Sequence, residues 1–209
     1  MLSNLSGVDL IIILVSIIVS MSFHEAMHGF VAHWLGDTTA QDAGRLTLNP
    51  LKHIDLYTTV LLPMVLIAIR VFPIFAAKPV PFNSDRLKHG EFGVALVGIA
   101  GPLTNLFLAV IAGIIFRAFG ADLSQGLSNI IYLFAFVNVA FFIFNMIPFP
   151  PLDGSRLLYA FAPEPLQENM MRIESMGFLS LLVFIIIIFQ FAQGLIGNIE
   201  YHVLSFILG

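Results

Sequence analysis

The feature that most constrains this chain is a series of apolar runs that are nearly free of charge and long enough to cross a membrane. The runs are residues 8–35, 56–77, 92–119, 129–147, 177–193 and a shorter one at 194–208. About 20 apolar residues in a helix span the ~30 Å hydrocarbon core of a bilayer. The whole chain is 58% hydrophobic and 11% charged, unlike an ordinary soluble domain. The sequence therefore predicts an all-α, polytopic membrane protein, a bundle of about four to six membrane helices.

The same composition predicts one domain and argues against several classes of function. We find no internal repeat and no linker, so residues 1–209 are predicted to form a single domain, with a core at about 8–160 and apolar C-terminal segments at 176–208. The net charge is −4 and the nine Lys and Arg residues form no basic patch, which argues against a nucleic-acid partner. The chain has no cysteine, so a bound metal would need His and carboxylate ligands.

Basic residues predict the orientation of the chain in the membrane. They gather between the first and third runs and after the fourth: Arg45, Lys52, Arg70, Lys78, Arg86, Lys88, Arg156 and Arg172. Because such residues favour the cytoplasmic side, we predict that these loops are cytoplasmic and that the N-terminus is outside. The first run is predicted to be a retained helix and not a cleaved signal. All the basic loops share one side only if residues 56–77, which contain Pro63 and Pro73, are re-entrant or lie against the bundle.

Two short segments on the same side are predicted to be extended. "GRLTLNP" at 44–50 alternates polar and apolar residues, and "KPVPF" at 78–82 has prolines at alternate positions. Proline cannot donate to a β-ladder, so the second segment can form only an edge or unpaired strand. Near a membrane cleft such an edge could pair with an extended peptide. Two surface loops are an equally good interpretation of these residues.

The stretch "SMSFHEAMHGFVAHWLGD" at 20–37 places two histidines and a glutamate inside the first apolar run. On a helix, His24 and His28 lie one turn apart on one face, so both imidazoles can bind a single metal ion. Glu25 lies beside them and can reach a water molecule without being a ligand, as in the H-E-x-x-H motif of zinc hydrolases. The alternative is a His–Glu pair that hydrogen-bonds neighbouring helices. We favour the metal site because unpaired ionisable groups are costly in hydrocarbon.

A catalytic zinc needs a third protein ligand and one open position, and Asp153 is the predicted third ligand. It lies in "NMIPFPPLDGSRLL", where prolines end the fourth run and Gly154 permits a tight turn. Its carboxylate is thereby expected on the same side as the C-terminal part of the first run. The other histidines are less suitable because they lie off the ligand face, in charged loops or near the C-terminus: His33, His53, His89 and His202.

These motifs together resemble the site-2 protease family of intramembrane zinc metalloproteases. The resemblance rests on "FHEAMHGFVAHWLGD", on "GPLTN" at 101–105 and on "NVAFFIFNMIPFPPLDG" at 138–154. "GRLTLNPLKHID" and "AKPVPFN" also resemble loops of short prokaryotic members. The matching stretches span most of residues 20–155. The sequence shows neither the PDZ insertion nor the CBS pair that other members use for regulation.

The resemblance implies a site that holds one Zn²⁺ per chain. Its ligands would be His24, His28 and Asp153, and Glu25 would be the catalytic residue. In that chemistry Glu25 takes a proton from the attacking water and passes it to the leaving amine.

The resemblance also implies roles for three asparagines within the apolar runs. Asn105 and Asn145, and also Asn138, match intramembrane asparagines of the family. They are candidates for stabilising the oxyanion or for holding the substrate backbone. Each could instead make a hydrogen bond between helices, and we favour that interpretation for Asn138.

The predicted function is that of a zinc-dependent intramembrane endopeptidase that cuts peptide bonds in or near transmembrane segments of membrane proteins. Its partners would be such a substrate and the lipid bilayer, in a prokaryotic plasma membrane, with the active site toward the cytoplasm. Two alternatives remain open: a metal-ion transporter, and a non-catalytic protein of the same fold that only binds membrane segments. The sequence does not indicate the substrate, the trigger or the oligomeric state.

Overall fold

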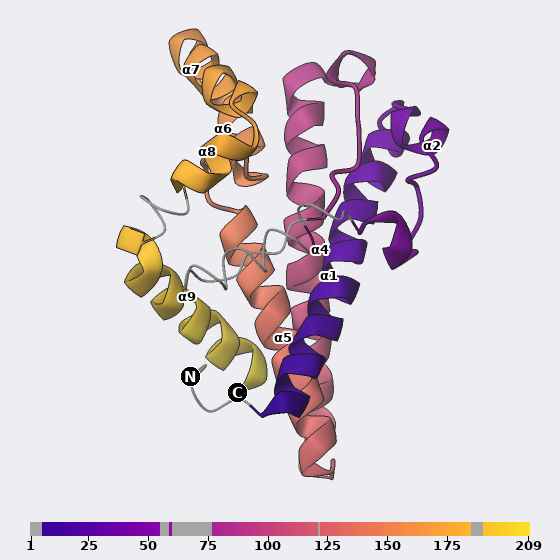
Figure 1. Ribbon diagram of the computed structural model, residues 1–209, viewed down its shortest axis with the longest axis vertical. Helices are drawn as coiled ribbons and strands as arrows, with labels where there is room; N and C mark the ends of the chain where they lie inside the picture. The colour runs from indigo at the N-terminus through magenta and orange to yellow at the C-terminus, as the bar shows by residue number, and fades with distance from the viewer. Residues whose placement is uncertain (1–5, 55–58, 60–76, 121, 185–189) are drawn as a thin grey trace.

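The computed structural model describes residues 6–54, 59, 77–120, 122–184 and 190–209. Among these residues, three helices are long and apolar enough to cross a bilayer: α1 (Gly7–Trp34), α4 (Gly90–Phe119) and α5 (Gln125–Asn145). They form a bundle in which α1 and α5 run in the same direction and α4 runs antiparallel to both (Figure 1). The prediction of an all-α, polytopic membrane protein is confirmed.

Local signals set the two ends of α1. At its start, the Ser6 hydroxyl accepts the Asp9 backbone N–H at 3.2 Å, and the Asp9 carboxylate accepts the Ser6 backbone N–H at 2.8 Å. This reciprocal pair is a capping box, which satisfies N–H groups that have no partner within the helix. At its end, Gly36 adopts a φ of +107°, a conformation that favours glycine and ends the helix.

One face of α1 is polar although the helix is otherwise apolar. The stripe consists of buried residues spaced four apart: Ser16, Ser20, His24 and His28. Residues with this spacing lie above one another on a helix. Because α1 packs against α4 and α5, the stripe faces the interior of the bundle and not the lipid, and its two histidines bond groups of α4.

α4 is the central helix, in contact with α1, α5, α6 (Gly154–Phe161) and α9 (Gln190–Leu208). Glycines let its neighbours approach closely. A Cβ at Gly113 would lie 2.6 Å from the Ile207 carbonyl oxygen of α9, and a Cβ at Gly98 would lie 2.8 Å from Cβ of Arg156 in α6. Both helices therefore pack against α4 at positions where only a residue without a side chain fits.

Two of the predicted apolar runs, 56–77 and 194–208, differ in how far the structure describes them. The 56–77 run, predicted to be re-entrant or to lie against the bundle, falls outside the described residues apart from 59 and 77. The 194–208 run forms the C-terminal part of α9, whose Leu204 and Ile207 are buried against α4 and α5.

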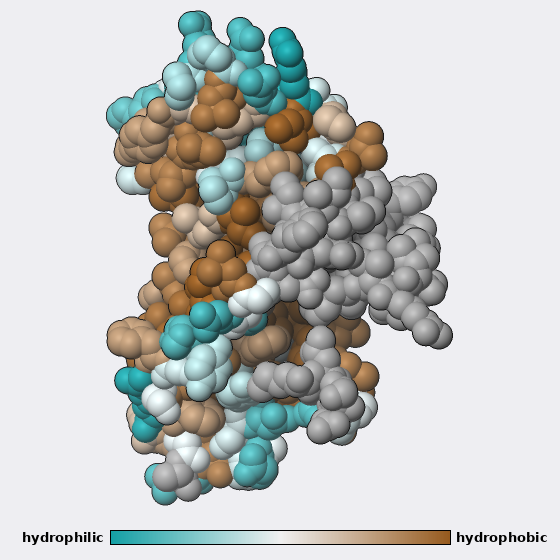
Figure 2. Space-filling model, turned by 90° about the vertical axis from the view of Figure 1, so that its left-hand side faces the viewer, coloured by the Kyte–Doolittle hydropathy of each residue, from teal (hydrophilic) through white to brown (hydrophobic). Residues whose placement is uncertain are grey.

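The connections at one end of the bundle carry the remaining short elements. These are α2 (Thr39–Asp42), η2 (Pro50–Lys52), η4 (Ser84–Arg86), α6, α7 (Glu164–Ser175) and α8 (Phe178–Val183). α2, α6 and α7 lie at the upper end in Figure 1. Figure 2 shows hydrophilic side chains gathered at this end above a hydrophobic zone. The described basic residues that were predicted to share one side all lie in these connections and short elements: Arg45, Lys52, Lys78, Arg86, Lys88, Arg156 and Arg172.

The predicted short strands need correction, since no β-strand forms among the described residues. Residues 44–50 make a turn and a bend, and residues 77–83 run as an irregular segment that we call the strap. The alternating prolines explain the second case. Pro79 and Pro81 have no N–H, so Val80 holds the only backbone donor between them, and that donor is bound to a side chain of α1.

Candidate metal centre

The site begins on α1, which carries His24, Glu25 and His28 on consecutive turns. Both imidazoles are buried, His24 with 6% and His28 with 8% of its surface exposed. One ligand atom from each of the three side chains lies within 4.8 Å of the other two. The i, i+4 spacing therefore brings the histidines together as helix geometry predicts.

Asp153 joins them from the turn between α5 and α6. Gly154 makes this turn possible, since a Cβ there would lie 2.8 Å from the Ile147 carbonyl oxygen. Gly98 of α4 lets the turn come close, because a Cβ at Gly98 would lie 3.1 Å from the Asp153 carbonyl oxygen. The two glycines thus bring the carboxylate against the histidines of α1.

The three predicted ligand atoms form a compact triangle. Asp153 Oδ2 lies 3.0 Å from His24 Nε2 and 3.4 Å from His28 Nε2. The two Nε2 atoms are 3.1 Å apart. Ligand atoms ~2.0–2.1 Å from a tetrahedral zinc ion are roughly 3.3 Å from one another. The spacing of the triangle therefore fits a single zinc ion.

The other nitrogen of each imidazole shows which atom is free to bind a cation. His24 Nδ1 lies 2.6 Å from Asn105 Oδ1, and His28 Nδ1 lies 2.7 Å from the Val97 carbonyl oxygen. Both partners are acceptors, so each Nδ1 carries a proton and donates it. In a neutral imidazole Nε2 then has only a lone pair. Three acceptor atoms consequently face one another, an arrangement that a bound cation satisfies.

Gly101 of α4 leaves the space that such a cation needs. A Cβ at this position would lie 2.5 Å from His28 Nε2 and 2.6 Å from His24 Nε2. Any side chain here would compete with the metal for the same volume. The residues present therefore fit a zinc ion both in donor chemistry and in space.

The Glu25 carboxylate is held by the strap. The Val80 backbone N–H donates to Glu25 Oε2 at 2.9 Å. Val80 can approach α1 this closely because Gly29 lies one helical turn after Glu25; a Cβ at Gly29 would lie 3.1 Å from Val80 Cγ1. One carboxylate oxygen is thus fixed, while the other has no hydrogen-bond partner among the described residues.

Both ends of the strap are anchored to the loops beside α1. At one end, Arg45 Nη2 donates to the Lys78 carbonyl oxygen at 2.7 Å and the Lys78 N–H donates to the His53 carbonyl oxygen at 2.9 Å. At the other end, the Asn83 N–H donates to Asp37 Oδ2 at 2.6 Å. These bonds hold Val80 over the metal centre.

The carboxylate of Asp37, which anchors the strap, is stabilised in its ionised form. Burial would raise the pKa of Asp37, but hydrogen bonds from Thr39 and from the Asn83 N–H, together with the charge of Arg86, lower it below its ordinary value. At neutral pH this carboxylate is charged and remains an acceptor for the strap.

The three candidate asparagines lie in different surroundings. Asn105 and Asn138 are fully buried and hydrogen-bond each other, Asn105 Nδ2 donating to Asn138 Oδ1 at 3.0 Å. Asn105 contacts the metal centre only through His24 Nδ1. Asn145, at the end of α5, is partly buried and donates to the Phe141 carbonyl oxygen at 3.0 Å within its own helix. Of the three asparagines, only Asn145 is partly exposed.

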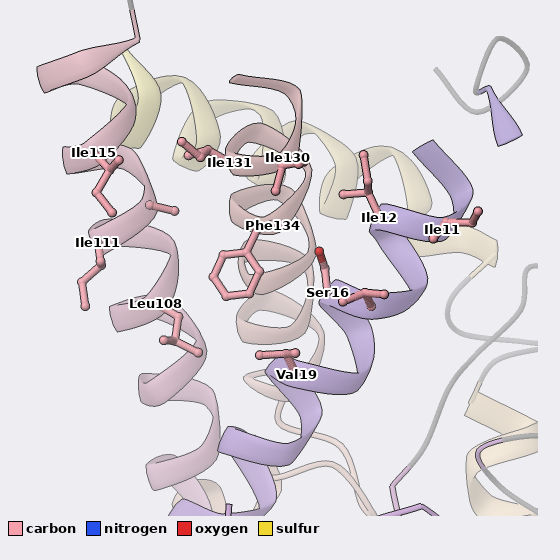
Figure 3. Close-up of a pocket in the computed structure, with 12 residues that line it drawn as sticks. Ile11, Ile12, Ser16, Val19, Leu108, Ile111, Ile115, Ile130, Ile131 and Phe134 are labelled. Carbon is pink, nitrogen blue, oxygen red and sulfur yellow. The ribbon is translucent and has the colours of Figure 1, made fainter. Parts of the chain in front are cut away.

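An apolar cavity lies elsewhere in the bundle. It measures about 440 Å³ and lies between α1, α4 and α5 (Figure 3). Of its lining residues only Ser16 is polar; the others include Ile11, Val19, Leu108 and Phe134. A cavity without ionisable groups offers no chemistry, so the metal centre and not this cavity is the candidate active site.

Three features of the site could not be predicted from the sequence. The Val97 carbonyl oxygen positions His28. Because this is a backbone group, the type of residue at position 97 gives no indication of the role. Val80 contributes its backbone N–H. The one indication of this in the sequence is that prolines flank Val80 on both sides. Gly101 belongs to "GPLTN", yet its contact with both histidines depends on how α4 is rotated against α1.

Comparison with known proteins finds relatives that are named as zinc metalloproteases. A profile described as "Peptidase family M50" matches residues 111–189. "Putative zinc metalloprotease YwhC" of Bacillus subtilis (strain 168) is 37% identical over 178 residues, which cover 82% of this chain and 78% of that protein. "Putative zinc metalloprotease Rip2" of Mycolicibacterium smegmatis is 29% identical over 176 residues, which cover 84% of this chain and 67% of that protein. No solved structure matches the chain.

The family assignment follows from the extent of these matches. The relative in Bacillus subtilis is 37% identical over most of both chains, and the M50 profile includes the segment that carries Asp153. The resemblance that the motifs indicated is thereby confirmed: this chain belongs to peptidase family M50, the site-2 protease family.

Proposed function

We propose that this protein is a zinc-dependent intramembrane endopeptidase that cuts peptide bonds in or near the membrane-spanning segments of other membrane proteins. Family membership makes it a membrane metalloprotease. One observation carries the finer proposal: the ligand atoms of His24, His28 and Asp153 lie 3.0–3.4 Å from one another beside the Glu25 carboxylate, at the interior of apolar helices.

His24, His28 and Asp153 would hold the zinc ion. When bound, zinc supplies Lewis-acid chemistry, which polarises a scissile carbonyl and makes a water molecule more acidic. Glu25 acts as the general base: it takes the proton of the attacking water and delivers it to the leaving amine. The Val80 N–H fixes one carboxylate oxygen of Glu25 and leaves the other to receive the proton.

Asn145 is the asparagine that we assign to the substrate. It is partly buried at the end of α5, eight residues before Asp153 in the chain, and among the described residues its amide bonds only a carbonyl of its own helix. A small rotation would let this amide donate to the substrate backbone or to a developing oxyanion. Asn105 and Asn138 are fully buried and are better placed to support the histidines.

The substrate segment must lose its helical structure before it can be cut. A helical peptide keeps its carbonyls in hydrogen bonds to N–H groups four residues later, so none of them is free for attack. The catalytic residues lie toward the end of the bundle that carries the basic loops, which we assign to the cytoplasm of a prokaryotic cell. Cleavage is therefore expected near the cytoplasmic end of the substrate's membrane segment.

Removing the metal is expected to abolish cleavage. In proteoliposomes with a tagged single-span peptide as substrate, the chelator 1,10-phenanthroline should stop cleavage and added zinc should restore it. The isomer 1,7-phenanthroline, which does not chelate, is the control and should leave the rate unchanged. Cleavage that continues after zinc has been removed would contradict the proposal.

The same experiment separates the two alternatives. A metal-ion transporter would move zinc across the vesicle membrane without cutting the peptide, and among the described residues we find no second cluster of His, Asp and Glu to continue a path. A non-catalytic binding protein of the same fold would retain the peptide intact. Zinc-dependent cleavage excludes both as the sole function.

A further inference from the structure

We propose that Asn138 is a positioning residue for the metal site, and that it acts through Asn105 to select the tautomer of His24 that can bind zinc. The inference rests on the proposed function, since it concerns a ligand of the proposed zinc ion. Asn138 belongs to α5, Asn105 to α4 and His24 to α1, so the relay joins the three long helices.

The relay starts from a backbone carbonyl that cannot change its role. Asn138 Nδ2 donates to the Phe134 carbonyl oxygen at 2.9 Å. If the amide of Asn138 were flipped, its oxygen would face this carbonyl oxygen, and two acceptors would repel each other. The Phe134 carbonyl therefore fixes the orientation of Asn138, with Oδ1 pointing to Asn105.

Asn105 is oriented in turn by two acceptors. Its Nδ2 donates to Asn138 Oδ1 at 3.0 Å and to the Ser20 carbonyl oxygen at 3.3 Å. These bonds use both N–H groups of the amide. Oδ1 is left to face His24 Nδ1, at 2.6 Å. Because Asn105 is fully buried, no water molecule is at hand to satisfy a flipped amide.

His24 responds to this acceptor with its proton. Nδ1 must carry the hydrogen in order to donate to Asn105 Oδ1, so Nε2 keeps its lone pair. Nε2 is the atom that lies 3.0 Å from Asp153 Oδ2 and 3.1 Å from His28 Nε2. A flipped Asn105 would present N–H to Nδ1 and favour the tautomer with hydrogen on Nε2, in which Nε2 has no lone pair to bind a metal.

The two histidines differ in how their tautomers are fixed. His28 Nδ1 donates directly to the Val97 backbone carbonyl at 2.7 Å, an acceptor that cannot flip. His24 depends instead on two side-chain amides that can flip. Loss of the acceptor at Asn138 should therefore disturb His24 and leave the tautomer of His28 unchanged. Residues that hydrogen-bond a metal ligand, as Asn105 does His24, typically change metal affinity by about 10–100-fold.

The test replaces Asn138, whose side chain bonds Asn105 and the Phe134 carbonyl oxygen and not a metal ligand. Asn138→Leu removes the acceptor, and Asn138→Ala does so without adding bulk. Zinc affinity is measured in detergent by competition with a chromophoric chelator. We expect both variants to bind zinc at least about tenfold more weakly than the wild type.

Asn129→Leu is the matched control. Asn129 also lies on α5 and also bonds α1 through its amide, Nδ2 donating to Asp9 Oδ1 at 2.6 Å. It has no bond to the relay, so this variant should bind zinc like the wild type. If it loses as much affinity as Asn138→Leu, the effect is a general loosening of the bundle and the proposal is overturned.

A second measurement reads the tautomer without zinc. In ¹⁵N-histidine NMR spectra of the metal-free protein, with His24 assigned by its absence in His24→Ala, Nδ1 of His24 should be protonated in the wild type. This proton should be partly lost in Asn138→Leu or Asn138→Ala, whichever folds, while His28 stays unchanged. Wild-type affinity and an unchanged His24 spectrum in either variant would overturn the proposal. A wild type that binds no zinc but shows the expected tautomer would instead refute the proposed function alone.

Discussion

Replacing Glu25 by Gln is expected to lower the rate of peptide hydrolysis by about 10²–10⁴-fold, the usual contribution of a general base. The change preserves size and shape, and an amide oxygen can still accept the Val80 N–H that now lies 2.9 Å from Oε2. It removes the only property that the chemistry needs from this residue, the ability to take up a proton. Cleavage of a tagged membrane-spanning peptide in proteoliposomes measures the effect.

The zinc content of Glu25→Gln shows whether the lost activity comes from the missing base or from a missing metal ion. Glu25 is outside the triangle of ligand atoms, so Glu25→Gln should hold as much zinc as the wild type. Glu91→Gln is the matched control: Glu91 is an exposed residue in the first turn of α4, and its replacement should leave the rate unchanged. A Glu25→Gln protein that still cuts at the wild-type rate would remove Glu25 from the mechanism.

Replacing Gly101 by Ala is expected to abolish zinc binding although it adds a single methyl group. The added Cβ would lie 2.5 Å from His28 Nε2 and 2.7 Å from His24 Cε1, far inside van der Waals contact. Either imidazole can escape only by turning away, which breaks its bond to Asn105 or to the Val97 carbonyl. The ligand triangle then opens. Metal analysis of the purified variant measures the outcome directly.

Gly126→Ala is the control for this substitution. Gly126 lies on α5, and a Cβ there would meet no atom within 4 Å. The same change should leave zinc content and cleavage as they are in the wild type. If Gly101→Ala also binds a full equivalent of zinc, the approach of α4 to the two histidines is not as close as described.

How far the sequence could predict the site depends on how locally each residue is placed. His24 and His28 meet because of helix geometry alone, which needs no knowledge of the fold. Asp153 follows prolines that end an apolar run, so its place at the end of α5 was also predictable. The triangle that these residues form agrees with the expectation, and their roles stay predictions.

The relay and the strap depend on tertiary contacts, which is why the sequence did not reveal them. Asn105 was considered for contact with a substrate. Instead, α4 is rotated so that Asn105 bonds Nδ1 of His24, the ring nitrogen that is not a predicted zinc ligand. The strap was expected to be an edge or unpaired strand or else a surface loop, and its prolines suit each of these states. The bond from Val80 to Glu25 could be foreseen only with α1 and the strap already placed side by side.

The central claim is that three residues from two distant parts of the chain bind one zinc ion. The most direct test is the zinc content of the detergent-purified protein, wild type beside Asp153→Ala, with Asp122→Ala, an exposed aspartate in the connection between α4 and α5, as the control. The account predicts about one zinc per chain in the wild type and in the control, and loss or strong weakening in Asp153→Ala. A folded wild type without zinc, or an Asp153→Ala protein that binds it equally well, would contradict the account.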